Sequence, residues 1–196
     1  MTSAELKKAK RDVRRRILAQ RDALTPARRH ELAALVTERL LALPELETAA
    51  TVMAFWSFGS EVATMPLIEA LLARGCVVAL PRIVDGELEP RTWLPGEPLT
   101  GTPFGAMEPE GGAVLGPEAI DVIVTPAVAF DRDGRRVGYG GGFYDRFFTR
   151  ARSDAARVGV GFGLQLVDEQ LPGAGFDLRV GVVVTDSETV RCRIDP

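Results

Sequence analysis

The feature of this sequence that most constrains its fold is a series of short apolar runs that alternate with helical segments. The first two runs enclose the segment MPLIEALLARG, which follows Thr64, a residue type suited to capping a helix. Strands that are joined through a helix need a crossover connection and therefore lie parallel. We predict an α/β protein with an open, mostly parallel sheet flanked by helices. The predicted strands are TVMAFWSF (51–58), CVVALPRI (76–83), DVIVTPAVAF (121–130), RVGVGFG (157–163) and VGVVVT (180–185).

Two helices are expected ahead of the first strand. Residues 4–23 are good helix formers and include neither glycine nor proline. Thr25 and Pro26 fit the N-cap and the first position of a second helix, which is predicted over residues 26–42.

The middle of the chain is its least regular part. Residues 85–120 are rich in proline and glycine, and we predict one strand there, around Leu88–Trp93. No internal repeat divides the sequence, and 196 residues are enough for one sizeable core. We expect a single domain, residues 1–196, in which the helical pair of residues 4–42 packs on the sheet.

Composition argues against several classes of partner. The net charge of −3 gives no bulk attraction to nucleic acid, and no apolar run reaches the length of a membrane span. Cys76 and Cys192 form no CxxC pair, and the charged N-terminus is unlike a secretory signal. These features favour a reducing cytoplasm in which both thiols are unpaired. We expect a monomer, because no long apolar stripe is left exposed once the helices are assigned.

The single histidine limits the chemistry. His30 lies in ARRHELAALV, which is predicted to be an exposed helix, so Ser–His–Asp and Cys–His catalysis are not expected. A metal site built from several histidines is excluded for the same reason. Any metal should be a hard ion held by oxygen, which points to Mg²⁺.

A glycine-rich loop is the main functional signal. The segment DRDGRRVGYGGGFYDRFF lies between a predicted strand and a predicted helix and places four glycines within five positions, 138–142. Each glycine loses more backbone freedom on folding than another residue would, which favours a loop that approaches a ligand closely. The carboxyl ends of parallel strands gather ligands, and helix N-termini favour phosphate. Positive charge is added by Arg132, Arg135 and Arg136.

Two familiar phosphate motifs do not fit this loop. A P-loop needs a lysine directly after a glycine, and a GxGxxG fingerprint begun at Gly138 would place its third glycine at Phe143. The alternative is a tight strand-to-helix turn, although four glycines exceed what a turn requires. The role of Asp145 is also undecided from the residues alone, since a helix dipole favours an acid at this position whether or not the acid holds Mg²⁺.

The first helix carries a narrow row of cations beside its apolar stripe. At about 100° per residue, Lys7, Lys10, Arg14 and Arg21 fall together next to the stripe formed by Leu6, Val13, Ile17 and Leu24. One interpretation is an amphipathic helix whose long side chains reach water. The other is that Lys10 and Arg14 face an anion bound beside the sheet.

Several segments in the same order resemble the 5-formyltetrahydrofolate cyclo-ligase family, also called 5,10-methenyltetrahydrofolate synthetases. The resemblance runs from about residue 5 to about 186 and is most specific in the glycine loop. It implies a fold like the ribose-5-phosphate isomerase and CoA-transferase group, and an ATP- and Mg²⁺-dependent ring closure that releases ADP and phosphate. The matching segments are KRDVRRRILAQR, FGSEVAT, LPR (80–82), FGAMEP (104–109), PAVAFDRDGRRVGYGGGFYD (126–145) and GFGLQL (161–166).

The resemblance also implies roles for individual residues. Glu61 would bind the N–H donors of the pterin ring, whereas the sequence alone also allows a capping acid ahead of a helix. Asp145 and Asp177 would hold Mg²⁺, and Arg136 and Tyr144 would be catalytic. The implied ATP-binding residues are Lys10, Arg14, Arg136, Gly138, Gly140, Gly141, Gly142, Phe143 and Tyr144. The implied substrate-binding residues are Glu61, Tyr139, Gly140, Gly141, Gly142 and Phe143.

Three positions depart from the family pattern. Phe143 stands where the family often has tyrosine, and Tyr139 where some members have arginine. The segment LPGAGFD lacks the histidine that is common before Asp177.

Two other classes compete with this interpretation. A sugar-phosphate isomerase or CoA-transferase-like enzyme would share the fold and a phosphate-binding loop, but it would not need the cationic row. A non-catalytic sensor would bind folate or nucleotide without turnover, and it would not need a metal ligand beside the loop. ATP consumption that depends on formylfolate separates all three.

Overall fold

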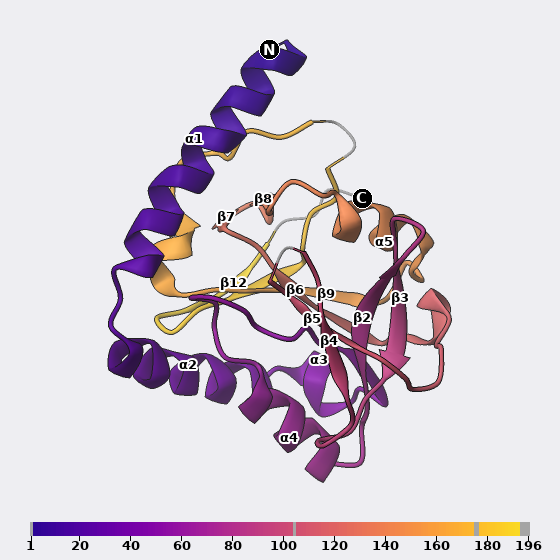
Figure 1. Cartoon of the computed structure of the whole chain (residues 1–196). Coiled ribbons are helices and arrows are strands. Elements are labelled where there is room, and N and C mark those ends of the chain that lie inside the picture. Colours follow the sequence, from indigo (N-terminus) through magenta and orange to yellow (C-terminus); the bar gives the residue numbers. More distant parts are fainter. Residues whose placement is uncertain (1, 104, 175–176, 193–196) are drawn as a thin grey trace.

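Seven strands form the main sheet of the computed structural model, which describes residues 2–103, 105–174 and 177–192 (Figure 1). The five central strands are parallel, and the two edge strands pair antiparallel with their neighbours. The predicted open, mostly parallel α/β sheet is confirmed; the likeness to the isomerase and transferase group stays a prediction. From edge to edge the strands are β12 (Thr189–Arg191), β11 (Val182–Val184), β9 (Ala156–Val160), β6 (Val122–Pro126), β1 (Thr51–Met53), β2 (Val77–Val84) and β3 (Glu87–Thr92).

The strand order creates a switch point between β1 and β6. The chain leaves β1 through α4 (Met65–Ala73) and enters β2 on one side, whereas it leaves β6 and returns through α5 (Phe143–Arg150) to β9 on the other. In open α/β sheets, ligands bind outside the carboxyl ends of the strands at such a point. The segments that follow β1 and β6 are therefore the expected walls of a site.

Helices cover both faces of the main sheet. On one face, α2 (Pro26–Leu41) packs against α4 and β11, and the short α3 (Pro44–Glu47) follows it. On the other face, α5 packs against β3. Val52 of β1 belongs to the core under α2 and α4, while Met53 belongs to the core that contains Phe147 and Phe148 of α5. This alternation is what a strand buried on both faces requires.

A second, small sheet carries the first helix. It has the order β10 (Leu166–Val167), β7 (Ala129–Asp131), β8 (Arg136–Val137). The first helix, α1 (Ser3–Asp22), lies along β7 and β8 in Figure 1, and its Ile17 packs with Val137 in a separate apolar cluster. The two N-terminal helices thus contact different sheets, α1 the small one and α2 the main one.

The predicted strands 51–58 and 121–130 differ most from the strands observed. Ladder pairing after Thr51 ends at Met53, although the run continues to residue 58. The run 121–130 is divided into β6 and β7, which belong to different sheets. Pro126, the last residue of β6, has no N–H for a further ladder bond, and this explains why the main-sheet strand stops there.

The region 85–120 contains three strands rather than the single one predicted. β3 matches the prediction and returns along β2 through Asp85 and Gly86, which both have positive φ, at 51° and 80°. An Asp-Gly pair favours such a hairpin turn. The other two, β4 (Leu99–Gly101) and β5 (Met107–Pro109), pair with each other and are too short to show a periodic pattern.

The predicted helix starts have mixed outcomes. Thr25 caps α2 as expected, and its hydroxyl oxygen accepts from Arg28 N at 3.2 Å. Thr64 precedes α4, but its side chain makes no capping bond; the hydroxyl instead donates to Phe55 O at 2.6 Å. His30 is exposed as predicted, and Phe104 of the FGAMEP segment lies outside the described residues.

Among the described residues, no helix combines the length and the apolar character that crossing a bilayer requires. Cys76 and Cys192 are both free thiols, as expected.

Candidate active site

A closed crevice, with no room for a water molecule, lies at the carboxyl ends of β1, β6 and β9, beside the switch point. Phe55 follows β1, Pro126 ends β6 and Val160 ends β9. The crevice therefore lies where the strand order predicts a ligand site. Its lining residues are Arg21, Phe55, Glu61, Val62, Pro126, Ala127, Val160 and Gln165.

Glu61 is the acidic group of this crevice. Tyr139 Oη donates to Glu61 Oε1 at 2.7 Å, and Phe58 N donates to Glu61 Oε2 at 3.1 Å. Burial raises the pKa of Glu61, while the bonds from Tyr139 and Phe58 and the charge of Arg21 act to lower it. The bond to Phe58 closes the turn before α4, so the carboxylate serves local structure as well as facing the crevice.

Arg21 joins this group, although sequence reasoning gave it no role beyond membership of the cationic row. It is 3% exposed. Its Nε donates to Ser60 Oγ at 2.9 Å, and its Nη2 donates to Tyr139 Oη at 2.9 Å. Its place on the same helical strip as Lys10 and Arg14 was the available signal, but nothing in the sequence showed that it would be buried.

The four glycines of the loop differ in what requires a glycine at each position. Gly140 and Gly142 have φ values of +110° and +67°, which side chains rarely adopt. A Cβ on Gly141 would lie 2.4 Å from the Phe143 ring. Gly138 has neither constraint, and nothing lies within 4 Å of the place where its Cβ would be. A tight turn therefore explains three of the four glycines and leaves Gly138 without a conformational reason.

The strand before this loop differs from the one predicted. The loop follows β8, which runs back antiparallel to β7 in the small sheet, rather than a parallel strand of the main sheet. The hairpin delivers the loop to the end of α5 at which Gly142 is the N-cap residue. The backbone N–H groups of the first turn of α5 therefore adjoin the loop, as a phosphate site requires.

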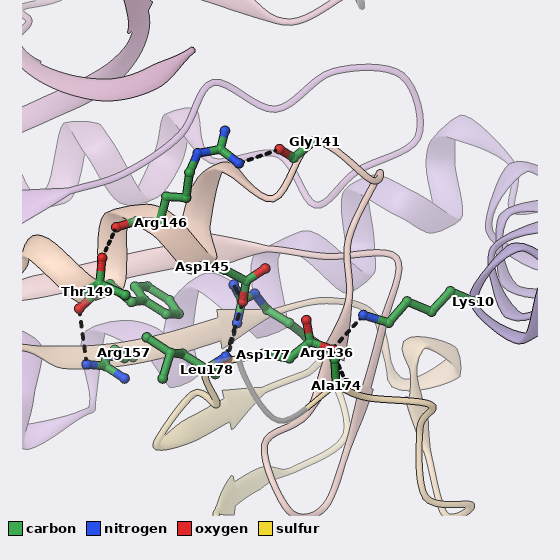
Figure 2. Close-up of polar contacts among 11 residues, drawn as sticks. Lys10, Arg136, Gly141, Asp145, Arg146, Thr149, Arg157, Ala174, Asp177 and Leu178 are labelled. Atoms are coloured by element: carbon green, nitrogen blue, oxygen red, sulfur yellow. Dashed lines mark hydrogen bonds and ion pairs between the residues drawn. The ribbon is translucent and has the colours of Figure 1, made fainter. Parts of the chain in front are cut away.

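Lys10 and Arg14 reach this region from α1. Arg14 Nε donates to Gly138 O at 2.6 Å, and Lys10 Nζ donates to Asp177 Oδ2 at 2.6 Å. Figure 2 shows Lys10 extending from its helix toward Asp177 and Arg136. Partial burial lowers the pKa of Arg14. The two cations proposed from the helical row are thus brought to the loop and to the chain segment around Asp177.

Arg136 is a second buried cation of the site, and it is 9% exposed. Its Nη2 lies 2.8 Å from Asp145 Oδ1, its Nη1 donates to Leu178 O, and its guanidinium lies 4.6 Å from the Phe148 ring centroid. Burial lowers the pKa of Arg136, and the charges of Asp145 and Asp177 raise it. Arg132 by contrast is paired with Asp168 and Glu188 on the surface, so its charge does not serve the loop.

The two predicted metal ligands lie on the same charged cluster. Asp145 Oδ1 accepts from Arg136 and from Leu178 N at 3.2 Å, and Asp177 Oδ2 accepts from Lys10 and from Ala174 N at 2.7 Å (Figure 2). No group of three or more possible ligands occurs in the part of the chain that the structure describes. Two oxygen ligands still suit Mg²⁺, which commonly takes one or two carboxylates and completes its shell with water and phosphate.

Tyr144 and Phe143 begin α5 directly after the glycines. Tyr144 Oη is buried and has no hydrogen-bond partner among the described residues. Burial raises the pKa of Tyr144, the charge of Glu61 raises it further, and the charge of Arg136 lowers it. The hydroxyl therefore stays protonated at neutral pH. The Phe143 ring packs under the guanidinium of Arg146, at 5.1 Å from its centroid.

An open cleft of about 310 Å³ adjoins the Lys10 side of the site. Three of its lining side chains are arginines and one is an acid, so the cleft favours an anionic ligand. The lining residues are Arg135, Arg136, Gly173, Ala174, Asp177 and Arg179.

Comparison with known proteins decides the family. The model of the 5-formyltetrahydrofolate cyclo-ligase family matches residues 6–186. The chain belongs to this family. The resemblance that the sequence segments predicted is therefore confirmed, and the match contains every candidate residue from Lys10 to Asp177.

Individual cyclo-ligase relatives match along most of their length. The 5-formyltetrahydrofolate cyclo-ligase of Escherichia coli strain K12 is 36% identical over 178 residues, which cover 88% of this chain and 97% of the relative. That of Haemophilus influenzae is 33% identical over 180 residues, covering 86% and 93%. The solution structure of Aquifex aeolicus 5,10-methenyltetrahydrofolate synthetase is 32% identical, with a TM-score of 0.81 and coverage of 95% and 94%.

Proposed function

We propose that this chain closes 5-formyltetrahydrofolate to 5,10-methenyltetrahydrofolate and consumes ATP through a phosphorylated formyl intermediate. One observation carries the proposal. Two successive residues of the glycine loop contact the two halves of the site: Gly138 O accepts from Arg14, and Tyr139 Oη donates to Glu61. The loop therefore joins a group suited to phosphate with a group suited to a pterin. The family and the names of its members support the same reaction.

The phosphate half offers positive charge and free backbone donors. Lys10, Arg14 and Arg136 would contact ATP phosphates, with the backbone of the glycine loop and the start of α5. The open space beside Gly138 suits close approach of a ligand to the backbone. Phosphoryl transfer needs positioning and neutralised charge more than a covalent catalyst, so the lack of a site histidine is no obstacle.

Asp145 and Asp177 would hold Mg²⁺ through the carboxylate oxygens that do not accept from Arg136 and Lys10. When bound, the ion would neutralise charge on the ATP phosphates. In the structure each acid already forms an ion pair with one of these cations: Asp177 with Lys10, and Asp145 with Arg136.

The pterin half offers one carboxylate and one aromatic face. Glu61 would accept N–H donors from the pterin ring. Tyr139 and Phe58 lie with ring centroids 5.3 Å apart and provide apolar surface next to it. Tyr139 contributes a hydroxyl and a ring at this position, and no charge.

The proposed chemistry has two steps. The formyl oxygen attacks the γ-phosphorus of ATP and ADP leaves, which converts a poor leaving group into a phosphate ester. The N10 lone pair then attacks the activated formyl carbon, the N10 proton passes to solvent, and the C–O bond breaks as phosphate departs. Arg136 and the protonated hydroxyl of Tyr144 would donate to oxygens that gain negative charge on the way.

A sugar-phosphate isomerase or CoA-transferase-like activity fits less well. Neither activity explains why Arg14 reaches the loop from α1 while Lys10, one turn away, reaches Asp177. A folate or nucleotide sensor would not require the pair of acids beside those cations.

Absorbance in the near ultraviolet tests the proposal directly. Purified protein, 5-formyltetrahydrofolate and Mg²⁺ should produce the methenyl chromophore only when ATP is added, with ADP released in equal amount. Chromophore growth without ATP would refute the phosphorylated intermediate. ATP binding without any growth would leave a nucleotide site that acts on another acceptor.

A further inference from the structure

Arg146 joins the glycine loop to the turn between β2 and β3. Its Nη1 donates to Gly141 O at 3.0 Å, its Nη2 donates to Gly86 O at 2.7 Å, and its Nε donates to Glu87 Oε1 at 2.9 Å. The guanidinium also lies over the Phe143 ring, 5.1 Å from its centroid. Every nitrogen of the guanidinium is therefore engaged, and two of its three acceptors are backbone carbonyls.

The bond to Gly141 O sets the direction of the next N–H group. A trans peptide bond points its C=O and its N–H in opposite directions. Because Arg146 holds Gly141 O on its own side, the N–H of Gly142 in the same peptide faces the other way. Figure 2 shows this contact on one side of the start of α5, with Asp145 and Arg136 on the other. In the described part of the chain no group accepts from Gly142 N, so this donor stays available.

A peptide between two glycines does not keep its direction without support. Gly141 and Gly142 lack the side chain that restricts the backbone angles, so the peptide that joins them turns over at little cost. A carbonyl turned toward a phosphate would repel it, whereas an N–H attracts it. At the other end of the loop, Arg14 Nε donates to Gly138 O at 2.6 Å. Arginines from two different helices therefore hold the carbonyls at both ends of the loop.

The packing around the Arg146 guanidinium leaves no room for side chains on the loop. A Cβ on Gly141 would lie 2.4 Å from the Phe143 ring, and a Cβ on Gly142 would lie 3.0 Å from Arg146 Nη1. The ring in turn supports the guanidinium. A side chain at either glycine would displace the group that holds Gly141 O.

We propose that Arg146 is a positioning residue for the nucleotide: it fixes the peptide between Gly141 and Gly142 so that the N–H faces the phosphates of ATP. Arg146 does not itself contact ATP, because its donors are already used by the loop and by the β2–β3 turn. This inference rests on the proposed function and adds to it a residue that acts through the backbone of the loop.

The exposure of the clamp separates this role from a role in stability. The side chains of Arg146 and Glu87 are 43% and 39% exposed. An ion pair in this much solvent contributes little to the free energy of unfolding. Loss of Arg146 should therefore affect the binding of ATP more than the melting temperature.

The test measures the Kd for ATP with Mg²⁺ and the Kd for 5-formyltetrahydrofolate separately, by calorimetry. Arg146→Met should raise the Kd for ATP about tenfold, because the loop must then be ordered when the nucleotide binds. The Kd for 5-formyltetrahydrofolate should stay within twofold of the wild-type value. Arg146→Lys should behave like Arg146→Met, since an ammonium group does not reproduce the planar fork of the guanidinium.

Arg150→Met is the matched control. Arg150 lies one turn further along α5, is 44% exposed and pairs with the same Glu87, at 3.3 Å. Its contact joins the same two elements and does not involve the glycine loop. This variant should have the melting temperature of Arg146→Met and the ATP affinity of the wild-type protein.

Glu87→Gln distinguishes positioning from direct contact with the nucleotide. This change weakens the hold on Arg146 and keeps the arginine charge. If Arg146 acts through Gly141, the Kd for ATP should rise about threefold. If Arg146 binds phosphate directly, its release from Glu87 should leave the Kd for ATP unchanged or lower it, and this result would overturn the inference.

The outcomes also separate this inference from the proposed function. ATP-dependent turnover, together with a Kd for ATP in Arg146→Met within twofold of the wild-type value, overturns the role of Arg146 alone. Glu87→Gln decides the question if the Arg146 variants fail to fold. Absence of ATP binding to the wild-type protein overturns both proposals.

Discussion

Lys10 Nζ and Asp177 Oδ2 lie 2.6 Å apart, which ties the first helix to a segment 167 positions later in the chain. Both side chains are largely buried, with exposed fractions of 19% and 16%. An ion pair with little solvent around it holds its partners more firmly than a surface pair does. The pair therefore holds Lys10 in place for the phosphate contact that we propose for it.

Replacing Lys10 with methionine should raise the KM for ATP by about tenfold to a hundredfold, since a charged hydrogen bond to phosphate is lost. The Kd for 5-formyltetrahydrofolate should change little, because Glu61 and Tyr139 are untouched. Steady-state kinetics at varied ATP gives the first value and calorimetry the second. Lys8→Met, at an exposed position of the same helix, is the matched control. An unchanged KM for ATP would show that Lys10 serves only the fold.

Asp145→Asn should shift the Mg²⁺ titration of activity to higher concentration and slow turnover. The asparagine oxygen can still accept from Arg136 and Leu178 N, so the fold around α5 should survive, but the negative charge that attracts the ion is gone. Activity is measured as a function of free Mg²⁺ at saturating ATP. Asp168→Asn, on an acid whose side chain is 89% exposed, is the control. A titration that matches the wild-type curve would refute the metal assignment.

Glu61 gives a prediction about pH. Burial raises the pKa of Glu61 in the folded protein, so folding favours its protonated form. The free energy of unfolding contributed by this group is highest below the ordinary glutamate pKa and falls as pH rises through the raised value. Glu61→Gln removes this loss, so the melting temperature of the variant relative to the wild-type protein should rise as the pH is raised from below the ordinary glutamate pKa toward neutrality.

The same substitution should weaken folate binding and spare the nucleotide. Glutamine offers one acceptor oxygen where the carboxylate offers two, and its amide N–H₂ would face the N–H of Phe58. The Kd for 5-formyltetrahydrofolate should rise while the Kd for ATP stays constant. Equal loss of both affinities would argue against a pterin role for Glu61.

The sheet was predictable because its strands are short apolar runs separated by helices, and the loop because glycine clusters are rare. The division of 121–130 into β6 and β7 was not, since an apolar run has no mark that shows where a strand leaves one sheet for another. The burial of Arg21 could not be predicted either, because the residues that surround it, 60 and 139, lie far along the chain. The pairing of Lys10 with Asp177 depends on the same kind of distant contact.

Alanine substitutions at two glycines of the loop should distinguish an effect on backbone conformation from an effect on ATP binding. Gly142→Ala should destabilise the protein by about 1–2 kcal/mol, because φ at this position is +67°. Gly138→Ala should leave the melting temperature near the wild-type value, since its Cβ would enter open space. If ATP approaches the backbone there, Gly138→Ala should nevertheless raise the KM for ATP severalfold. A stable Gly138→Ala variant with unchanged KM would show that this glycine does not contact the nucleotide.

Tyr144→Phe should lower kcat without lowering the free energy of unfolding. The hydroxyl of Tyr144 is buried without a partner among the described residues, so removing it should leave the free energy of unfolding unchanged or raise it by up to about 1 kcal/mol. If the hydroxyl donates to oxygens that gain charge during the reaction, kcat should fall about a hundredfold with little change in either KM. Chemical denaturation gives the first quantity and the methenyl absorbance assay the second. A Tyr144→Phe variant that is as active as the wild-type protein would remove Tyr144 from the catalytic residues and leave Arg136 as the remaining donor.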